Sequence, residues 1–288
     1  MNYADSAFIK TDKPISKYAI SSFTRNQPLK KFTPKPTSQT TISNNNALEK
    51  SIVLIGPVGA GKSLVSEALS RYNDMPVIEL DDLRFANTKH PLLPNIRNYN
   101  EMGYDPNIAD YLGQMYGPVA WHMYQKKFEI ELFNQVSQQL KVPCIISTGG
   151  GAPISLEKDY EIWFNRLQNI EPELFAKSFN LKQISAAKTA ETFKKFKNRV
   201  YLQLPYNYEQ TMTKAAKDKL NKGFIGTGQY DKLATHTINV GGLVKGNSVD
   251  QYTLDQIVND ISRTINNPIK QQSSTTQNTI PAFACDKK

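Results

Sequence analysis

A short apolar run that leads directly into a glycine-rich turn constrains this chain most. Residues 52–63 read Ile-Val-Leu-Ile-Gly-Pro-Val-Gly-Ala-Gly-Lys-Ser, so a segment of strand length precedes the pattern G-x-x-x-x-G-K-S. The apolar residues from Leu64 to Leu69 then keep helical spacing. A strand, a glycine turn and a helix in this order predict a loop whose backbone N–H groups point inward at a phosphate group.

Each residue type in this turn has a chemical reason. Glycines lack a Cβ atom, so the backbone at Gly56, Gly59 and Gly61 can curl around a phosphate. Lys62 would add a positive charge against the β- and γ-phosphates, and the Ser63 hydroxyl would bind Mg²⁺. The following helix would direct the positive end of its dipole at the same anion. The residues predicted to bind a nucleoside triphosphate are Gly56, Pro57, Val58, Gly59, Ala60, Gly61, Lys62, Ser63 and Leu64.

The net charge of +9 belongs largely to the N-terminal part of the chain. Residues 1–48 hold seven Lys and Arg residues and two Asp residues, so they carry +5 of the total. The remaining charge is ordinary for a protein that handles polyanionic nucleotides. No stripe of aromatic and basic residues accompanies the charge, and we therefore expect no nucleic-acid partner.

Composition divides the chain into a central domain and two tails. Residues 1–48 and 269–288 are polar and lack a sustained period, so we expect disordered tails around one domain at 49–268. No apolar run is long enough to span a membrane, so we expect no membrane partner. Cys144 and Cys285 suggest no disulfide framework. We expect a cytoplasmic monomer, with organelle targeting or secretion through the basic tail as alternatives.

Apolar runs and helical patterns alternate through the central domain. Strands are predicted at 52–55, 76–80, 143–147, 200–204 and 236–240, and helices at 62–72, 116–140, 207–221 and 254–265. A long loop is expected over 87–106 and a variable helical segment over 155–197. This alternation predicts a three-layer α/β fold, a parallel five-stranded sheet flanked by helices. Ligands of such sheets bind at the carboxyl ends of the strands.

Two further motifs follow strands at that edge. Glu79-Leu80-Asp81-Asp82 follows the second strand, where one carboxylate can reach toward Mg²⁺ and the next can accept a proton from an attacking hydroxyl. Acidic residues that cap a following helix are the alternative. Gly149, Gly150 and Gly151 follow the third strand, and three residues without Cβ atoms let the backbone approach a ligand closely. A plain flexible turn is the alternative for this triplet.

Together these elements resemble shikimate kinases, small phosphotransferases with a phosphate-binding loop (P-loop, here residues 56–63) and a nucleoside-monophosphate-kinase-like architecture. The resemblance spans about 51–265 and is carried by residues 54–63, 76–81 and 147–151. It implies ATP and Mg²⁺ as cofactors and a small hydroxylated molecule as phosphate acceptor. It places Ser63 and Glu79 at the metal, Lys62 and Asp81 in catalysis, and Asp81 also at the acceptor hydroxyl. It further implies that the triplet Gly149, Gly150 and Gly151 lines the acceptor pocket.

The chain departs from the family pattern on the acceptor side. The family holds the acceptor carboxylate with an arginine on a helix, and the best match here places Lys126 at that position with Glu129 beside it. A rival register places His122 and Gln125 there. Lysine is a point charge and does not grip a carboxylate with two parallel hydrogen bonds. The position of a second substrate arginine is Gly226.

The segment that should form a lid also differs. No arginine lies between Val200 and Tyr230, whereas the family pattern places phosphoryl-stabilising arginines there. The leading hypothesis is an ATP-dependent phosphotransferase that acts on a hydroxyl of shikimate or a related metabolite. The alternative is a catalytically weak nucleotide-binding module that regulates or binds a partner. The glycine triplet argues against a nucleoside-monophosphate kinase.

Overall fold

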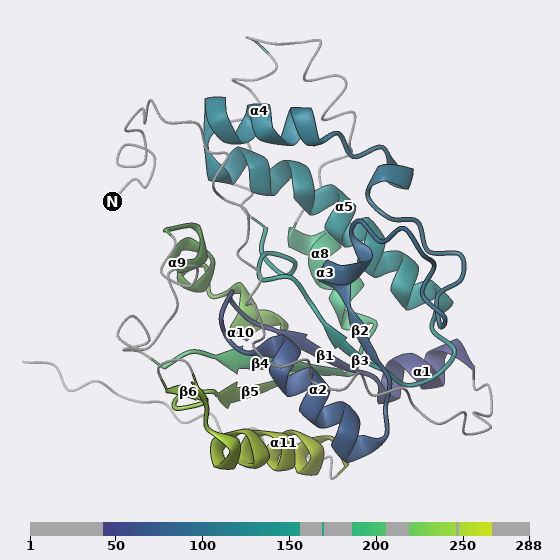
Figure 1. The fold of residues 1–288 in the computed structure, drawn as a ribbon, viewed down its shortest axis with the longest axis vertical. Helices are drawn as coiled ribbons and strands as arrows, with labels where there is room; N and C mark the ends of the chain where they lie inside the picture. The colour runs from purple at the N-terminus through teal and green to yellow at the C-terminus, as the bar shows by residue number, and fades with distance from the viewer. Residues whose placement is uncertain (1–42, 156–168, 170–185, 206–218, 246–247, 267–288) are drawn as a thin grey trace, which may run out of the picture.

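Five parallel strands form the centre of the molecule. The structure, a computed structural model, describes residues 43–155, 169, 186–205, 219–245 and 248–266. The strands of the sheet are β1 (Ile52–Ile55), β2 (Val77–Glu79), β3 (Ile145–Ser147), β4 (Asn198–Gln203) and β5 (His236–Asn239). Their order across the sheet is β2-β3-β1-β4-β5, and every pairing is parallel (Figure 1). The predicted three-layer α/β fold with a parallel five-stranded sheet is confirmed.

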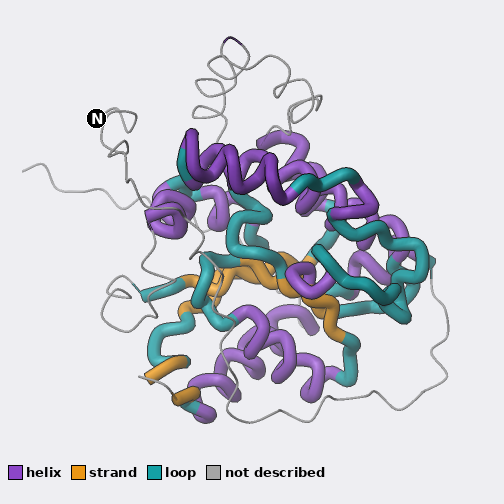
Figure 2. The backbone as a smooth tube through the Cα atoms, turned by 45° about the horizontal axis from the view of Figure 1, so that its top comes forward, coloured by secondary structure: helices purple, strands orange, loops and turns teal. Residues whose placement is uncertain are grey.

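Helices cover both faces of this sheet (Figure 2). One face carries α2 (Lys62–Asn73) and α11 (Gln251–Asn266), which pack on each other. The other carries α5 (Pro118–Gln139), α8 (Ala186–Lys194) and α10 (Gln229–Leu233), with α1 (Asn44–Lys50) and α4 (Pro106–Tyr116) against α5. The short elements are α3 (Leu80–Leu83), the 3₁₀ helix η1 (Asn100–Met102), α9 (Lys219–Gly226), β6 (Val244–Lys245) and β7 (Ser248–Val249). None of the described helices combines the length and apolar character needed to cross a membrane.

Strand β1 is buried on both faces, which explains its unbroken apolar sequence. Ile52 and Leu54 join the apolar cluster under α2 and α11. Val53 and Ile55 join the larger cluster under α5 and α8. Burial of each such side chain contributes about 1.5–3 kcal/mol to stability. A parallel strand covered by helices on both sides therefore needs no polar positions.

Helix α4 was missed by the sequence analysis, although its start signal is present. The side chain of Asp105 accepts a hydrogen bond from the backbone N–H of Asn107 at 2.8 Å, and Pro106 occupies the first helical position. Gly117, at a φ of +86°, separates α4 from α5. The predicted helix 116–140 is therefore the second of two packed helices.

The N-terminal boundary also differs from the prediction. Helix α1 begins at Asn44, inside the range assigned to the basic tail, and Asn44 Nδ2 donates to the carbonyl of Leu140 at 2.8 Å. Ala47 of this helix is fully buried. These tertiary contacts with the end of α5 leave no periodic signal in so short a segment. Residues 1–42, 156–168, 170–185, 206–218, 246–247 and 267–288 lie outside the described residues, and with them the C-terminal tail and most of the predicted helix 207–221.

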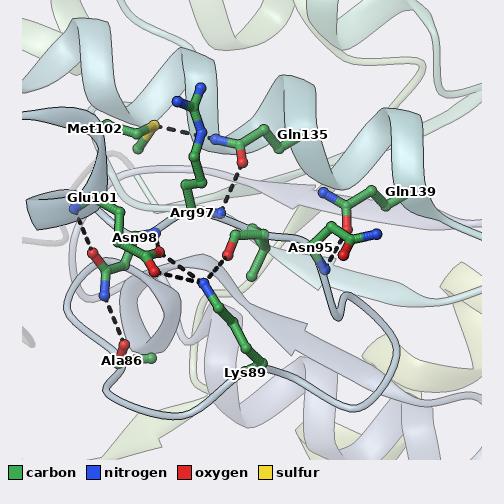
Figure 3. A network of polar contacts seen from close by, with 10 residues as sticks. Ala86, Lys89, Asn95, Arg97, Asn98, Glu101, Met102, Gln135 and Gln139 are labelled. Atoms are coloured by element: carbon green, nitrogen blue, oxygen red, sulfur yellow. Dashed lines mark hydrogen bonds and ion pairs between the residues drawn. The ribbon is translucent and has the colours of Figure 1, made fainter.

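The segment between β2 and α4 contains the predicted long loop, and polar contacts hold it against α5 (Figure 3). The Lys89 amine donates to Glu101 Oε1 at 2.7 Å, which closes the loop on itself. Gln135 of α5 accepts a hydrogen bond from the backbone N–H of Arg97 at 2.8 Å. This segment is therefore fixed to the same helix that carries Glu129.

Candidate active site

In the turn between β1 and α2, the side chain of Lys62 binds the backbone of the same turn. Gly59 and Gly61 have φ angles of +84° and +79°, in the region where a Cβ atom is strongly disfavoured. The Lys62 amine donates to the carbonyl of Gly56 at 2.8 Å and to that of Pro57 at 2.9 Å. The glycine positions that the sequence singled out are thus used for the backbone conformation that a phosphate-binding loop needs.

The electrostatic surroundings of Lys62 connect the P-loop to the acidic residues of the site. Burial lowers the pKa of Lys62 to about 8, and the carboxylates of Asp81, Glu79 and Glu129 oppose this shift. Asp81 is the strongest of the three. The lysine and the aspartate that were predicted to share catalysis therefore lie within reach of each other's charge.

Ser63 and Glu79, the predicted Mg²⁺ residues, are neighbours. The Ser63 hydroxyl donates to Glu79 Oε2 at 3.3 Å, and the Ser66 hydroxyl donates to Glu79 Oε1 at 2.8 Å. Burial raises the pKa of Glu79, and hydrogen bonds from Ser147 and Ser66 oppose that rise. A hydroxyl and a carboxylate side by side at a phosphate-binding loop fit Mg²⁺, which takes oxygen ligands and shares them with phosphates. The described residues contain no cluster of three or more His, Cys, Asp or Glu side chains suited to a metal ion.

The middle glycine of the triplet packs against the P-loop. A Cβ atom on Gly150 would lie 2.8 Å from Val58 Cγ2 and 3.0 Å from the Val58 backbone nitrogen. A Cβ atom on Gly151 would lie 2.5 Å from Cε1 of His122. None of the three glycines has a φ in the left-handed region, so the backbone conformation does not require glycine here. Glycine is required because a Cβ atom would have no room. The triplet follows β3 directly and joins the P-loop to the inner face of α5.

Gly149 faces a cluster of three charged side chains, which we call the acidic–arginine cluster (Asp81, Arg84 and Glu129). A Cβ atom on Gly149 would collide with Arg84 and Glu129, and it would lie 3.1 Å from Asp81 Oδ1. Arg84 Nη2 lies 2.7 Å from Asp81 Oδ1 and 2.8 Å from Glu129 Oε1. The side chain of Asp81 is 61% exposed, whereas those of Arg84 and Glu129 are 15% and 5% exposed. Asp81 is therefore the member of the cluster that an incoming molecule can reach.

Arg84 was not among the predicted site residues. Burial alone would lower its pKa, but Glu129, Tyr99 and Asp81 hold that pKa above its ordinary value, so the guanidinium stays charged. The sequence carried one signal for this residue, an acid and an arginine three positions apart. The spacing pairs them only on a helix, and the prediction placed Asp81 at a strand end.

The structure corrects that placement of Asp81. Strand β2 ends at Glu79, and Asp81 lies in the first turn of α3. An acid is favoured near the start of a helix because the backbone N–H groups there carry partial positive charge. Glu79 and Asp81, predicted to serve the metal and the acceptor hydroxyl, therefore come from two successive elements, and Arg84, which follows α3, pairs with Asp81 three positions before it.

One stripe of α5 faces the glycine triplet. His122, Lys126 and Glu129 follow one another at helical spacing, and all three are buried. The Lys126 amine, predicted to hold an acceptor carboxylate, donates to the backbone carbonyls of Gly151, at 3.3 Å, and of Ala152. Burial lowers the pKa of Lys126 to about 7 and that of His122 to about 3. The contacts of Lys126 therefore support the triplet backbone.

A second group of residues that the sequence analysis missed comes from α9 and α10. Asn221 Oδ1 accepts a hydrogen bond from the Val58 N–H at 2.9 Å, and its Nδ2 donates to the Val58 carbonyl at 3.2 Å. The hydroxyl of Tyr230 donates to the carbonyl of Gly150 at 2.6 Å. The P-loop and the glycine triplet are therefore held from the same side by one short region of the chain.

Comparison with known proteins finds structural similarity at low sequence identity. The shikimate kinase from Acinetobacter baumannii in complex with shikimate aligns over 78% of this chain and 97% of its own, with 16% identity and a TM-score of 0.43. The shikimate kinase from Bacteroides thetaiotaomicron aligns over 75% and 98%, with 16% identity and a TM-score of 0.44. A gluconokinase from Sinorhizobium meliloti 1021 aligns over 76% and 93%, with 16% identity and a TM-score of 0.33. No protein-family model and no curated protein sequence matches the chain.

Proposed function

We propose that this protein is an ATP-dependent phosphotransferase that transfers the γ-phosphate of ATP to a hydroxyl of shikimate or a related small molecule. The observation that carries the proposal is the packing of Gly150 against Val58, which joins the P-loop to the glycine triplet. The reachable carboxylate of Asp81 lies beside the same triplet. A phosphate-binding loop next to an accessible carboxylate is what transfer to a hydroxyl needs.

The nucleotide half of the site would consist of the P-loop, with Leu64 beyond it, and the metal residues. The backbone of residues 56–64 and the Lys62 amine would hold the phosphates of ATP. Ser63 would bind Mg²⁺ directly, and Glu79 would bind it through a water molecule. When bound, Mg²⁺ neutralises charge on the β- and γ-phosphate oxygens.

The acceptor half would centre on Asp81. Its carboxylate would orient the acceptor hydroxyl and accept the proton as the hydroxyl oxygen attacks phosphorus. Arg84 would fix the direction of Asp81, because Nη2 binds it at 2.7 Å. Gly149, Gly150 and Gly151 would form the wall beside the acceptor, and Glu129 would contribute a second carboxylate. Lys126 would hold the backbone of the triplet in place through its hydrogen bonds to the carbonyls of Gly151 and Ala152.

The test is product formation from a panel of small hydroxylated acceptors. Protein, ATP, Mg²⁺ and each acceptor are incubated, and phosphorylated products are identified by mass spectrometry alongside ADP release. We expect at least one acceptor to be phosphorylated, and Lys62→Ala to abolish the product. Lys141→Ala, at an exposed position on the loop before β3, serves as the matched control and should keep the activity. MgATP binding without any phosphorylated product would favour the catalytically weak nucleotide-binding module.

That alternative has one sequence observation in its favour. The chain has no arginine between Val200 and Tyr230, and a phosphoryl-stabilising arginine can be worth roughly 10³-fold or more in rate. The acceptor panel separates the two functions, because the module binds nucleotide without consuming it.

A further inference from the structure

Among the residues that the structure describes, the arginine and the lysine on the acceptor side already have partners. Arg84 Nη2 is shared between two carboxylates, at 2.7 Å from Asp81 and 2.8 Å from Glu129. The Lys126 amine donates to two backbone carbonyls of the loop after β3. His122 packs its ring against Phe224 at 4.6 Å between centroids, and because burial lowers its pKa to about 3 it offers no positive charge, although its Nε2 has no hydrogen-bond partner among the described residues. An acceptor that carries a carboxylate would have to displace one of these contacts.

Contacts with Tyr99 also hold Arg84 in place. Its guanidinium carbon lies 5.9 Å from the centre of the Tyr99 ring, and the backbone N–H of Tyr99 donates to the Arg84 carbonyl at 2.7 Å. The loop that contains Tyr99 is fixed by the contacts of Lys89 and Arg97 (Figure 3). Arg84 Nε has no hydrogen-bond partner among the described residues, but it is buried, so a bound molecule cannot reach it. The arginine is therefore a fixed part of the wall.

The charge of the acidic–arginine cluster (Asp81, Arg84 and Glu129) favours one class of acceptor. Two carboxylates share a single guanidinium, so the cluster itself carries net negative charge beside Gly149. The two lysines within reach of this charge, Lys62 and Lys126, donate to backbone carbonyls. A carboxylate brought to this place meets like charge, and like charges placed side by side weaken binding. Hydroxyl groups, in contrast, donate hydrogen bonds to carboxylates and accept them from a guanidinium.

We infer that the acceptor is an uncharged polyhydroxyl compound, a sugar or polyol, and that the shared contact of Arg84 with Asp81 and Glu129 excludes hydroxy acids. This inference rests on the proposed phosphotransferase function and narrows its acceptors from shikimate or a related small molecule to the uncharged related compounds. Neighbouring hydroxyls of the acceptor bind Asp81 and the edge of the cluster, and one of them is the phosphorylated group. Arg84 is a specificity-determining residue because its Nη2 group already binds both carboxylates, and because the described lysine and arginine on the acceptor side, Lys126 and Arg84, both have partners.

The experiment compares acceptors that share a skeleton and differ in charge. Shikimate is tested against its methyl ester, and gluconate against glucitol, with kcat/KM measured for each at fixed MgATP. We expect the uncharged member of at least one pair to be phosphorylated with a kcat/KM at least about tenfold above that of the acid. A preference for the acids, with product formed, would overturn the inference and leave the proposed function standing. If no member of any pair is phosphorylated, the inference fails together with the proposed function.

A variant of Glu129 tests whether the acidic–arginine cluster sets the preference for uncharged acceptors. Glu129→Gln keeps the size of the side chain and removes one of the two charges that Arg84 neutralises. We expect the ratio of acid to uncharged kcat/KM to rise by about tenfold, even where the absolute rates fall. Glu131→Gln, an exposed acid two positions along α5, should leave the ratio unchanged. A purely structural role of Glu129 would lower both rates together, and an unchanged ratio would overturn the inference.

Discussion

Asn221 binds the backbone of Val58 through both ends of its amide group. The side chain accepts from the Val58 N–H at 2.9 Å and donates to the Val58 carbonyl at 3.2 Å, across 163 positions of sequence. Val58 belongs to the P-loop, and Asn221 belongs to α9, whose Phe224 contacts His122 on the acceptor side. The shape of the P-loop therefore depends on a helix that also borders the proposed acceptor site.

Removal of this amide should loosen the P-loop. In Asn221→Ala the Val58 N–H and carbonyl lose a partner, and each unsatisfied group costs about 1–3 kcal/mol when it stays buried. We expect MgATP affinity, measured by calorimetric titration, to fall by about tenfold. Asn221→Asp retains the acceptor but places a charged oxygen against the Val58 carbonyl and near the proposed phosphate site, so its affinity should be no higher than that of Asn221→Ala. Wild-type affinity in Asn221→Ala would show that the contact does not shape the nucleotide site.

A methyl group on Gly150 should separate the two loops. The new Cβ atom would lie 2.8 Å from Val58 Cγ2 and 3.0 Å from the Val58 nitrogen, and this nitrogen cannot move without distorting the P-loop. Gly150→Ala should lower the free energy of unfolding by about 1–3 kcal/mol and weaken MgATP binding. Gly226→Ala is the control, because nothing lies within 4 Å of a Cβ atom there. Equal effects of the two substitutions would contradict the packing argument.

Nucleotide affinity should depend on pH through Lys62. Burial lowers the pKa of this amine to about 8 from the ordinary 10.5, and a phosphate anion beside it would raise the pKa again. Binding therefore takes up protons above pH 8, and MgATP affinity should be about tenfold weaker at pH 9 than at pH 7. Calorimetric titrations at both pH values, in buffers of different ionisation enthalpy, measure the affinity and the proton uptake.

Lys62→Arg is the control for this pH dependence. Arginine keeps its charge throughout the range, so any residual MgATP binding by the variant should show no proton uptake between pH 7 and pH 9. Equal wild-type affinities at the two pH values would place the Lys62 amine away from the bound phosphates.

The fold and the P-loop could be predicted because their signals are local. The apolar strand, the glycines at 56, 59 and 61, and the spacing of the following helix all occur within about twenty residues. Helix α1 could not be predicted in the same way, because Asn44 and Ala47 are ordered by contacts with the far end of α5. A seven-residue helix has too few positions to show a period of its own.

The acceptor side of the site is built by contacts between residues that are far apart in the sequence. Such contacts leave no spacing pattern from which they could be predicted. Arg84 and Glu129 are 45 positions apart, so the sequence could not show that one guanidinium serves both Glu129 and Asp81. The same holds for Lys126, whose charge suggested anion binding until its carbonyl partners were known. Sequence analysis therefore singled out the glycine triplet as a place where a ligand would approach the backbone, but it could not identify the protein groups that lie against it.

In the proposed mechanism, Asp81 serves the acceptor and the P-loop serves the nucleotide, within one site. Asp81→Asn and Asp82→Asn form a matched pair, because the two exposed acids are adjacent in α3 and only Asp81 was found bound to Arg84 among the described contacts. The decisive measurement is the rate of acceptor phosphorylation for both variants, with MgATP affinity measured on the same samples. We predict that Asp81→Asn keeps MgATP affinity and loses about 10²- to 10⁴-fold in transfer rate, whereas Asp82→Asn keeps both. Transfer at the wild-type rate in Asp81→Asn would contradict the account.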